Sequence, residues 1–116
     1  PLVEATKEDG RPTLWVTDPM HGNTTTTASG QKTRDFDTIL SEVRSFFAIH
    51  RDLATWPGGL HVELTGADVA EVVGGPGGAG SRPARYESLV DPRLNPAQAF
   101  QIAAEVAALI ESAKPR

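Results

Sequence analysis

Cysteine is absent from the 116-residue chain, which excludes disulfides, thiolate metal ligands and cysteine nucleophiles. Basic residues are also few, since 11 Lys and Arg stand against 15 Asp and Glu, giving a net charge of -4. This balance argues against a nucleic-acid partner, which requires a basic face. No apolar run approaches the roughly 18 residues of a transmembrane helix, and no basic-then-apolar leader opens the chain. We therefore expect a cytoplasmic protein that binds neither nucleic acid nor membrane.

An initiator methionine is missing too, and the chain opens with Pro1. Apolar residues make up 39% and charged residues 22%, proportions typical of a globular protein. The length suffices for one small domain. These features favour a fragment, or a processed piece, of a longer globular protein.

Hydrophobic patterning predicts strands that alternate with helices. We expect an irregular lead-in over residues 1–11 and strands at 13–17, 60–65 and 86–90. Apolar residues at helical spacing predict one helix over 36–50, with Asp35 as its N-cap, and a second from Pro96 to about residue 113, with Asn95 as its N-cap. This alternation indicates an α/β fold with parallel strands.

The remaining segments carry turn-forming residues. Residues 18–34 are expected to form a long polar loop, and the glycine-rich residues 66–83 a flexible segment, with a short helical turn near 67–73 as an option. His50 would end the first helix, where a cation suits the helix dipole.

Three residues with metal-ligand chemistry lie near the predicted strand ends: His21, Glu63 and Asp91. The C-terminal ends of parallel strands share one face, so these side chains could converge there. Imidazole nitrogen with carboxylate oxygen suits Mn, Fe, Co or Zn. Spacing alone leaves simpler interpretations open, namely a surface histidine, a buried carboxylate paired with another group, and a turn residue before Pro92.

Four blocks of sequence make a family resemblance specific. They read W-V-T-D-P-M-H-G-N-T at 15–24, S-G-Q-K-T-R at 29–34, P-G-G-L-H-V-E-L-T-G at 57–66 and D-P-R-L-N at 91–95. These blocks are similar, in the same order, to motifs of the class II (plant-type) DAHP synthases, and the resemblance runs from about residue 11 to 110. The chain departs from the family at Thr17 and Val72, where the family commonly has Cys, and at Ala70, where it often has Thr.

The resemblance implies a (β/α)8 TIM barrel, of which residues 1–116 would be the C-terminal portion with about three parallel strands and their helices. It implies a metal-dependent condensation of phosphoenolpyruvate with erythrose 4-phosphate, giving DAHP and phosphate. His21, Glu63 and Asp91 would be three of four ligands of a divalent metal, Mn first, with Co, Fe or Zn as alternatives. The fourth ligand would be a Cys that this chain lacks. Expected partners are the two substrates and the remainder of the barrel or a further copy.

Asp18, Lys32 and Arg34 are the expected catalytic residues. Asp18, together with Asn23, flanks His21 and could orient it. Lys32 and Arg34 precede a helix, where a phosphate would meet cations and a helix N-terminus.

Arg93 is expected to pair with Asp91 or with another carboxylate.

Two other functions remain open for the chain: a related synthase of secondary metabolism, of aminoshikimate or phenazine type, and a truncated, non-catalytic barrel fragment.

Overall fold

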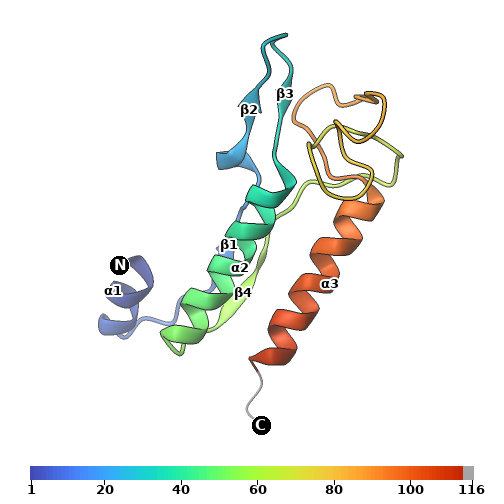
Figure 1. Cartoon of the computed structure of the whole chain (residues 1–116). Helices are drawn as coiled ribbons and strands as arrows, with labels where there is room; N and C mark the ends of the chain where they lie inside the picture. The colour runs from blue at the N-terminus through green and yellow to red at the C-terminus, as the bar shows by residue number, and fades with distance from the viewer. Residues whose placement is uncertain (114–116) are drawn as a thin grey trace.

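The computed structural model describes residues 1–113, so the last part of the expected segment, 114–116, lies outside the described residues. The elements follow one another along the chain as shown in Figure 1. They are α1 (Leu2–Glu8), β1 (Trp15–Thr17), the 3-10 turn η1 (His21–Asn23), β2 (Thr25–Thr26), β3 (Lys32–Thr33), α2 (Phe36–Asp52), β4 (Pro57–Leu60) and α3 (Pro96–Ser112). None of the helices within residues 1–113 is long and apolar enough to cross a membrane.

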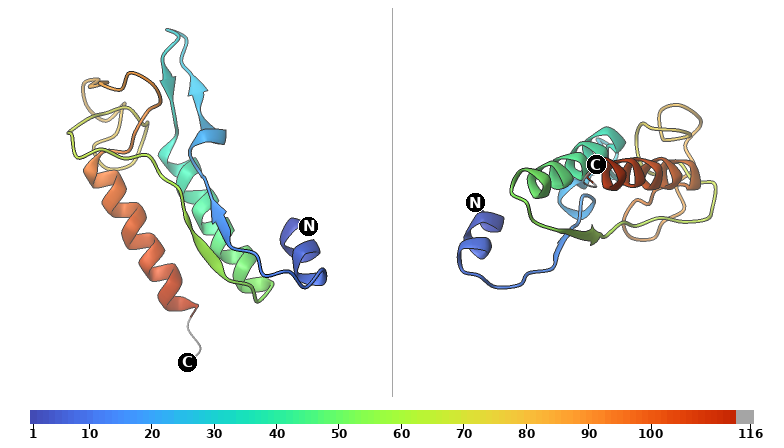
Figure 2. Two further views of the ribbon diagram at one scale, coloured as in Figure 1. Left: turned by 180° about the vertical axis from the view of Figure 1, so that it is seen from behind. Right: turned by 90° about the horizontal axis from the view of Figure 1, so that it is seen from below.

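A parallel pair of strands, joined through a helix, forms the centre of the fold. β1 lies beside β4 in parallel, with Val16 opposite Gly59 and Thr17 opposite Leu60. Parallel neighbours require a crossover connection, and α2 supplies it. Helix α2 lies against one face of this pair, whereas the other face is bare in both views of Figure 2. The predicted α/β class with parallel strands is confirmed at this level.

Both long helices begin where the sequence predicts. The Asp35 side chain accepts a hydrogen bond from the Thr38 backbone N–H at 2.8 Å, which satisfies one free donor of the first turn of α2. At the start of α3, Asn95 and Gln98 form a reciprocal capping box, with Pro96 at the first helical position. Capping and apolar periodicity therefore agree in these two elements.

The hydrophobic core lies between α2, the beginning of α3 and the irregular segments beside them. Its buried members are Met20, Phe36, Ile39, Leu40, Val72, Leu94 and Ile102. α2 buries nearly all of its apolar stripe, but α3 buries only Ile102 among the apolar side chains predicted to face inward. The stripe of α3 is thus only partly covered within the described residues, with Ala99 and Val106 half-buried against the core.

Two expectations for the first third of the chain are wrong. The lead-in contains α1, whose Leu, Glu, Ala and Lys residues are good helix formers. The polar loop contains an antiparallel hairpin, in which Thr25 pairs with Thr33 and Thr26 with Lys32. β-Branched threonine favours extended backbone, and Gly30 adopts the left-handed conformation (φ 82°) that the turn requires.

The later strands also differ from prediction. The strand expected at 60–65 is β4, which ends at Leu60. Within the described chain, residues 86–90 form no strand, and residues 67–73 form no helical turn. Leu89 and Val90 are 99% and 76% exposed, so no apolar face favours a strand there. Parallel pairing resumes instead at a single bridge between Leu64 and Leu94. Asp91 consequently precedes this bridge and does not end a strand.

Candidate metal centre

A turn anchored in the core positions His21 directly after β1. Met20, immediately before it, is fully buried, and its sulfur accepts a hydrogen bond from the Glu63 backbone N–H at 3.0 Å. Asp18 Oδ1 accepts hydrogen bonds from the backbone N–H groups of Met20 and His21, both at 3.0 Å. The buried Met20 was not anticipated from the sequence, although it lies inside a quoted motif.

The two ring nitrogens of His21 face different carboxylates. Nδ1 lies 2.7 Å from Asp18 Oδ2, and Nε2 lies 3.3 Å from Glu63 Oε1. Burial raises the pKa of Asp18, but hydrogen bonds from the backbone N–H groups of His21 and Met20 and from the His21 ring outweigh it, so this pKa lies below its ordinary value. A carboxylate on one ring nitrogen, with the other nitrogen directed at further ligands, is the usual arrangement around a metal-binding histidine.

Glu63 and Asp91 complete a compact group with His21. One ligand atom from each residue lies within 4.8 Å of the other two. One nitrogen and two carboxylate oxygens form a donor set that suits a divalent transition metal. His61 lies beside this group, with its ring centre 5.7 Å from that of His21, and an alternative grouping of Asp18, His21 and His61 meets the same distance limit.

Arg34 reaches the centre from below the surface. Its side chain is fully buried, and Nη1 donates hydrogen bonds to Glu63 Oε2 and to the Pro92 carbonyl, both at 2.6 Å. Nε donates to Thr24 Oγ1 at 2.8 Å, while the buried Nη2 has no hydrogen-bond partner within the described residues. The guanidinium thus joins the segment of one candidate ligand, Glu63, to the segment just after another, Asp91.

Lys32 lies at the exposed side of the same centre. Its Nζ lies 2.8 Å from Asp91 Oδ1, and more than half of its side chain is exposed. The Lys32 ammonium lowers the pKa of Asp91, and the Asp91 carboxylate raises the pKa of Lys32. A charged amine that is both exposed and next to the candidate metal site can meet an anionic substrate.

Two neighbouring side chains make other contacts. The Asn23 side chain donates to the Pro19 carbonyl at 2.9 Å and to Glu42 Oε2 at 2.7 Å, so these bonds stabilise the turn rather than orient the His21 ring. Arg93 pairs with Glu71 rather than with Asp91, which selects the second of the two expected partners. Glu71 itself was missed as a site-related residue, because its partner lies 22 positions away in the sequence.

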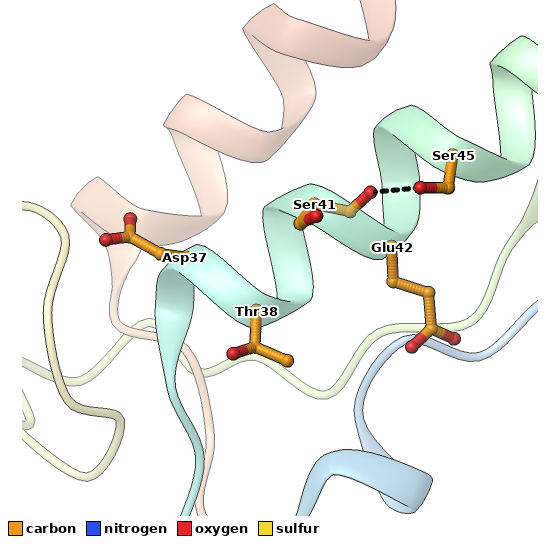
Figure 3. A pocket seen from close by; sticks show the side chains of 5 residues that line it. All are labelled: Asp37, Thr38, Ser41, Glu42 and Ser45. Atoms are coloured by element: carbon orange, nitrogen blue, oxygen red, sulfur yellow. Dashed lines mark hydrogen bonds between the residues drawn. The ribbon is translucent and has the colours of Figure 1, made fainter.

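A separate open depression lies on the exposed side of α2. Its lining residues are Asp37, Thr38, Ser41, Glu42 and Ser45 (Figure 3). The Ser45 hydroxyl donates to the Ser41 carbonyl at 2.9 Å, so part of the local polar surface is already paired within the helix. Neither histidine nor a basic residue lines this depression, and we assign it no function.

Comparison with known proteins gives concordant matches. The Class-II DAHP synthetase family matches residues 1–107. A phospho-2-dehydro-3-deoxyheptonate aldolase of Streptomyces coelicolor is 52% identical over 108 residues, which cover 91% of this chain and 24% of the relative. The aldolase AroG of Mycolicibacterium smegmatis is 44% identical over 112 residues, covering 95% of this chain and 24% of the relative.

A third relative is an aldolase of the same name from Streptomyces lividans. It is 53% identical over 95 residues, which cover 80% of this chain and 65% of the relative. The chain thus spans about a quarter of the length of the first two relatives. Because the family match covers nearly the whole sequence, this chain belongs to the class-II DAHP synthetase family.

Proposed function

We propose that this chain forms the C-terminal part of a (β/α)8-barrel catalytic domain, and that the complete domain is a 3-deoxy-7-phosphoheptulonate synthase. Family membership supports the activity. The parallel β1–β4 pair supports the architecture, because α2 connects the two strands along the chain. The parallel bridge between Leu64 and Leu94 supports it as well. Active sites of such barrels lie at the C-terminal ends of the strands, and the candidate metal centre follows β1 and β4.

The centre is proposed to hold a divalent cation through His21, Glu63 and Asp91. The observation that carries this proposal is the approach of one donor atom from each residue to within 4.8 Å of the others. A nitrogen with two carboxylate oxygens fits Mn, with Co, Fe or Zn as alternatives. A cation bound there would supply Lewis-acid polarisation of an aldehyde oxygen.

The proposed reaction joins phosphoenolpyruvate to erythrose 4-phosphate. A carbon–carbon bond forms between the enol methylene carbon and the aldehyde carbon, water adds to the former enol carbon, and phosphate leaves. The exposed Lys32 ammonium is proposed to bind an anionic group of a substrate.

Asp18 and Arg34 are proposed to act as positioning residues. Asp18 fixes the orientation of the His21 ring, and Arg34 fixes the Glu63 carboxylate. The Arg34 side chain is fully buried and therefore shielded from solvent. We propose that it holds the Glu63 carboxylate in place, instead of the phosphate contact expected from the sequence.

A synthase of secondary metabolism was the principal alternative, because Ala70 and Val72 depart from the family pattern. Both side chains are buried, at 3% and 0% exposure, and Val72 packs in the hydrophobic core. Neither residue belongs to the group of candidate metal ligands. The departures therefore concern packing, and no observation favours the secondary pathway over the proposed reaction.

The proposal is tested with the full natural chain that contains this sequence. Mn binding is measured by electron paramagnetic resonance, and turnover by the loss of phosphoenolpyruvate when erythrose 4-phosphate is added. Glu63→Gln removes a charged ligand and is expected to weaken Mn binding and to abolish most turnover. Glu105→Gln is the matched control, because Glu105 is a carboxylate paired with Arg44 between α3 and α2, away from the centre.

The two variants separate a proposed metal ligand from a half-buried carboxylate outside the centre. We expect Glu105→Gln to behave like the parent protein in both measurements. Unchanged Mn affinity and full turnover in Glu63→Gln would show that the centre has been assigned wrongly.

A further inference from the structure

Glu71 is a buried carboxylate with an unusually complete set of donors. Its side chain is 1% exposed, and its oxygens accept hydrogen bonds from the backbone N–H groups of Glu87 (3.1 Å), Ser88 (3.0 Å) and Arg93 (3.0 Å). The Arg93 guanidinium adds two more, from Nε and Nη2, both at 3.0 Å. Burying an ionised carboxylate is costly unless hydrogen bonds surround it. The buried Glu71 carboxylate therefore depends on its hydrogen bonds to Arg93 and to residues 87–88.

The donors come from both ends of the segment that carries Asp91. Residues 87–93 contain neither helix nor strand, and their middle is exposed at Leu89 and Val90. Within the segment, the Ser88 hydroxyl donates to the Asp91 carbonyl at 2.6 Å. Glu71 therefore binds the segment on each side of Asp91, where no regular secondary structure does so.

The backbone around Glu71 is also attached to the segment that carries Lys32 and Arg34. Thr33 Oγ1 donates to the Glu71 carbonyl at 2.9 Å, and the Val73 N–H donates to the Arg34 carbonyl at 2.8 Å. Thr33 and Arg34 directly follow Lys32 in the sequence, and Lys32 pairs with the Asp91 carboxylate. One short segment, 71–73, thus connects the backbone that carries Lys32 and Arg34 with the backbone that carries Asp91.

We propose that Glu71, through its ion pair with Arg93, is a positioning residue that holds Asp91 at the metal centre. This inference rests on the proposed function, because it assigns Asp91 as a metal ligand. Glu71 itself contacts neither metal nor substrate in this proposal. It acts by fixing both ends of a segment that has no regular secondary structure, alongside the contacts of Arg34 with Pro92 and of Lys32 with Asp91.

The test compares Mn binding by the parent full chain with that by Glu71→Gln, using electron paramagnetic resonance. Glutamine has nearly the same shape as glutamate. Its amide N–H₂, however, would face N–H groups that donate hydrogen bonds to the Glu71 carboxylate in the parent protein. Loss of an outer supporting contact commonly weakens metal binding about 10- to 100-fold, and we expect a loss in this range. Because Glu71→Gln keeps every proposed ligand, raising the Mn concentration should restore turnover, whereas Asp91→Asn should stay inactive at the same concentration.

Val43→Ala is the matched control for simple destabilisation. Val43 is fully buried in α2 and makes no hydrogen bond to residues 87–93, so this variant should lose stability while keeping parental Mn affinity. Should Glu71→Gln fail to fold, Arg93→Lys tests the same pair more gently, since it keeps the charge and loses the two-pronged geometry.

The outcomes distinguish this inference from the proposed function. A parent chain that binds Mn, with a Glu71→Gln or Arg93→Lys variant that binds it equally tightly, overturns the positioning role and leaves the proposed metal centre intact. A parent chain that binds no Mn and turns over without it overturns the proposed function and, with it, the role assigned to Glu71. Weakened Mn binding that excess Mn restores supports both.

Discussion

At the scale of single residues, His50 shows how burial changes the meaning of a sequence signal. Its position near the end of α2 suggests a protonated, cationic side chain that interacts favourably with the helix dipole. This expectation is wrong, because the side chain is 1% exposed and packs beside Phe46, with ring centres 4.6 Å apart. Burial lowers the pKa of His50, and Nδ1 lies 2.7 Å from the Thr55 hydroxyl. A neutral imidazole that fills an aromatic cluster fits these contacts better than a surface cation.

The lowered pKa of His50 predicts a specific pH dependence of stability. In the unfolded chain the imidazole takes up a proton near its ordinary pKa of 6.5, whereas the buried side chain resists protonation. Below this pH the unfolded state binds more protons, so the free energy of unfolding should fall as the pH drops from about 7 to about 5. His50→Gln removes this contribution, and urea unfolding at a series of pH values should give a shallower decline. Equal declines in the two proteins would contradict the prediction.

At the scale of elements, the sequence was informative where local signals suffice. Asp35, Asn95 and Pro96 predicted both helix starts, because a cap acts within one turn of the chain. The strand expected at 86–90 does not form, because distant contacts determine this segment. Its backbone N–H groups at Glu87 and Ser88 bind the Glu71 carboxylate, and a sequence pattern cannot indicate such a distant partner.

The candidate site was predictable to a similar extent. His21, Glu63 and Asp91 could be named from their expected strand-end positions and from the family motifs. The contributions of Met20 and Glu71 could not, because each depends on contacts between segments far apart in the chain. The orientation of Arg34 towards Glu63 is another such contact, since 29 positions separate the two residues.

The glycine-rich segment was expected to be flexible, but it is closely fitted to the start of α3. Asn95 Nδ2 donates to the Pro76 and Gly77 carbonyls at 3.2 and 3.0 Å, and Gln98 Nε2 donates to the Gly74 carbonyl at 2.8 Å. A Cβ atom at Gly78 would lie 1.9 Å from the Gly74 carbonyl oxygen. The absence of a side chain at Gly78 therefore permits this close approach of two turns.

Gly78→Ala is accordingly expected to destabilise the fold by about 1–3 kcal/mol, since backbone must move to admit the methyl group. Gly66→Ala is the matched control in the same irregular region, because an added Cβ there meets nothing within 4 Å. Its effect should stay within about 0.5 kcal/mol. Chemical denaturation measures both, and equal stabilities of the two variants would refute the packing argument.

At the scale of the whole molecule, the chain is more extended than a compact domain of its length. Its radius of gyration is 16.0 Å, against about 13 Å for a compact 116-residue domain. Large apolar side chains are exposed on several elements, among them Val16 at 53%, Trp56 at 79% and Phe100 at 75%. The bare face of the β1–β4 pair in Figure 2 belongs to the same pattern. These surfaces are of the kind that a larger assembly covers.

We therefore predict that the purified 116-residue chain self-associates and does not catalyse the condensation on its own. Exposed strand edges and apolar side chains favour association, and the proposed metal site lacks the fourth, cysteine ligand that the family resemblance implies. Analytical ultracentrifugation and the binding of a hydrophobic dye measure self-association. The loss of phosphoenolpyruvate, with erythrose 4-phosphate and Mn both added, measures catalysis. A well-behaved monomer with sustained turnover would contradict the prediction.

The long reach of the ion pair between Lys32 and Asp91, which are 59 positions apart, has a consequence for folding kinetics. Closing a chain loop of this length costs conformational entropy before Asp91 can join the other candidate ligands. The helices, whose contacts are local, can form before that closure. Ligand geometry should therefore arise late during folding, so that a Mn-dependent spectroscopic signal would develop after helical circular dichroism in a refolding experiment.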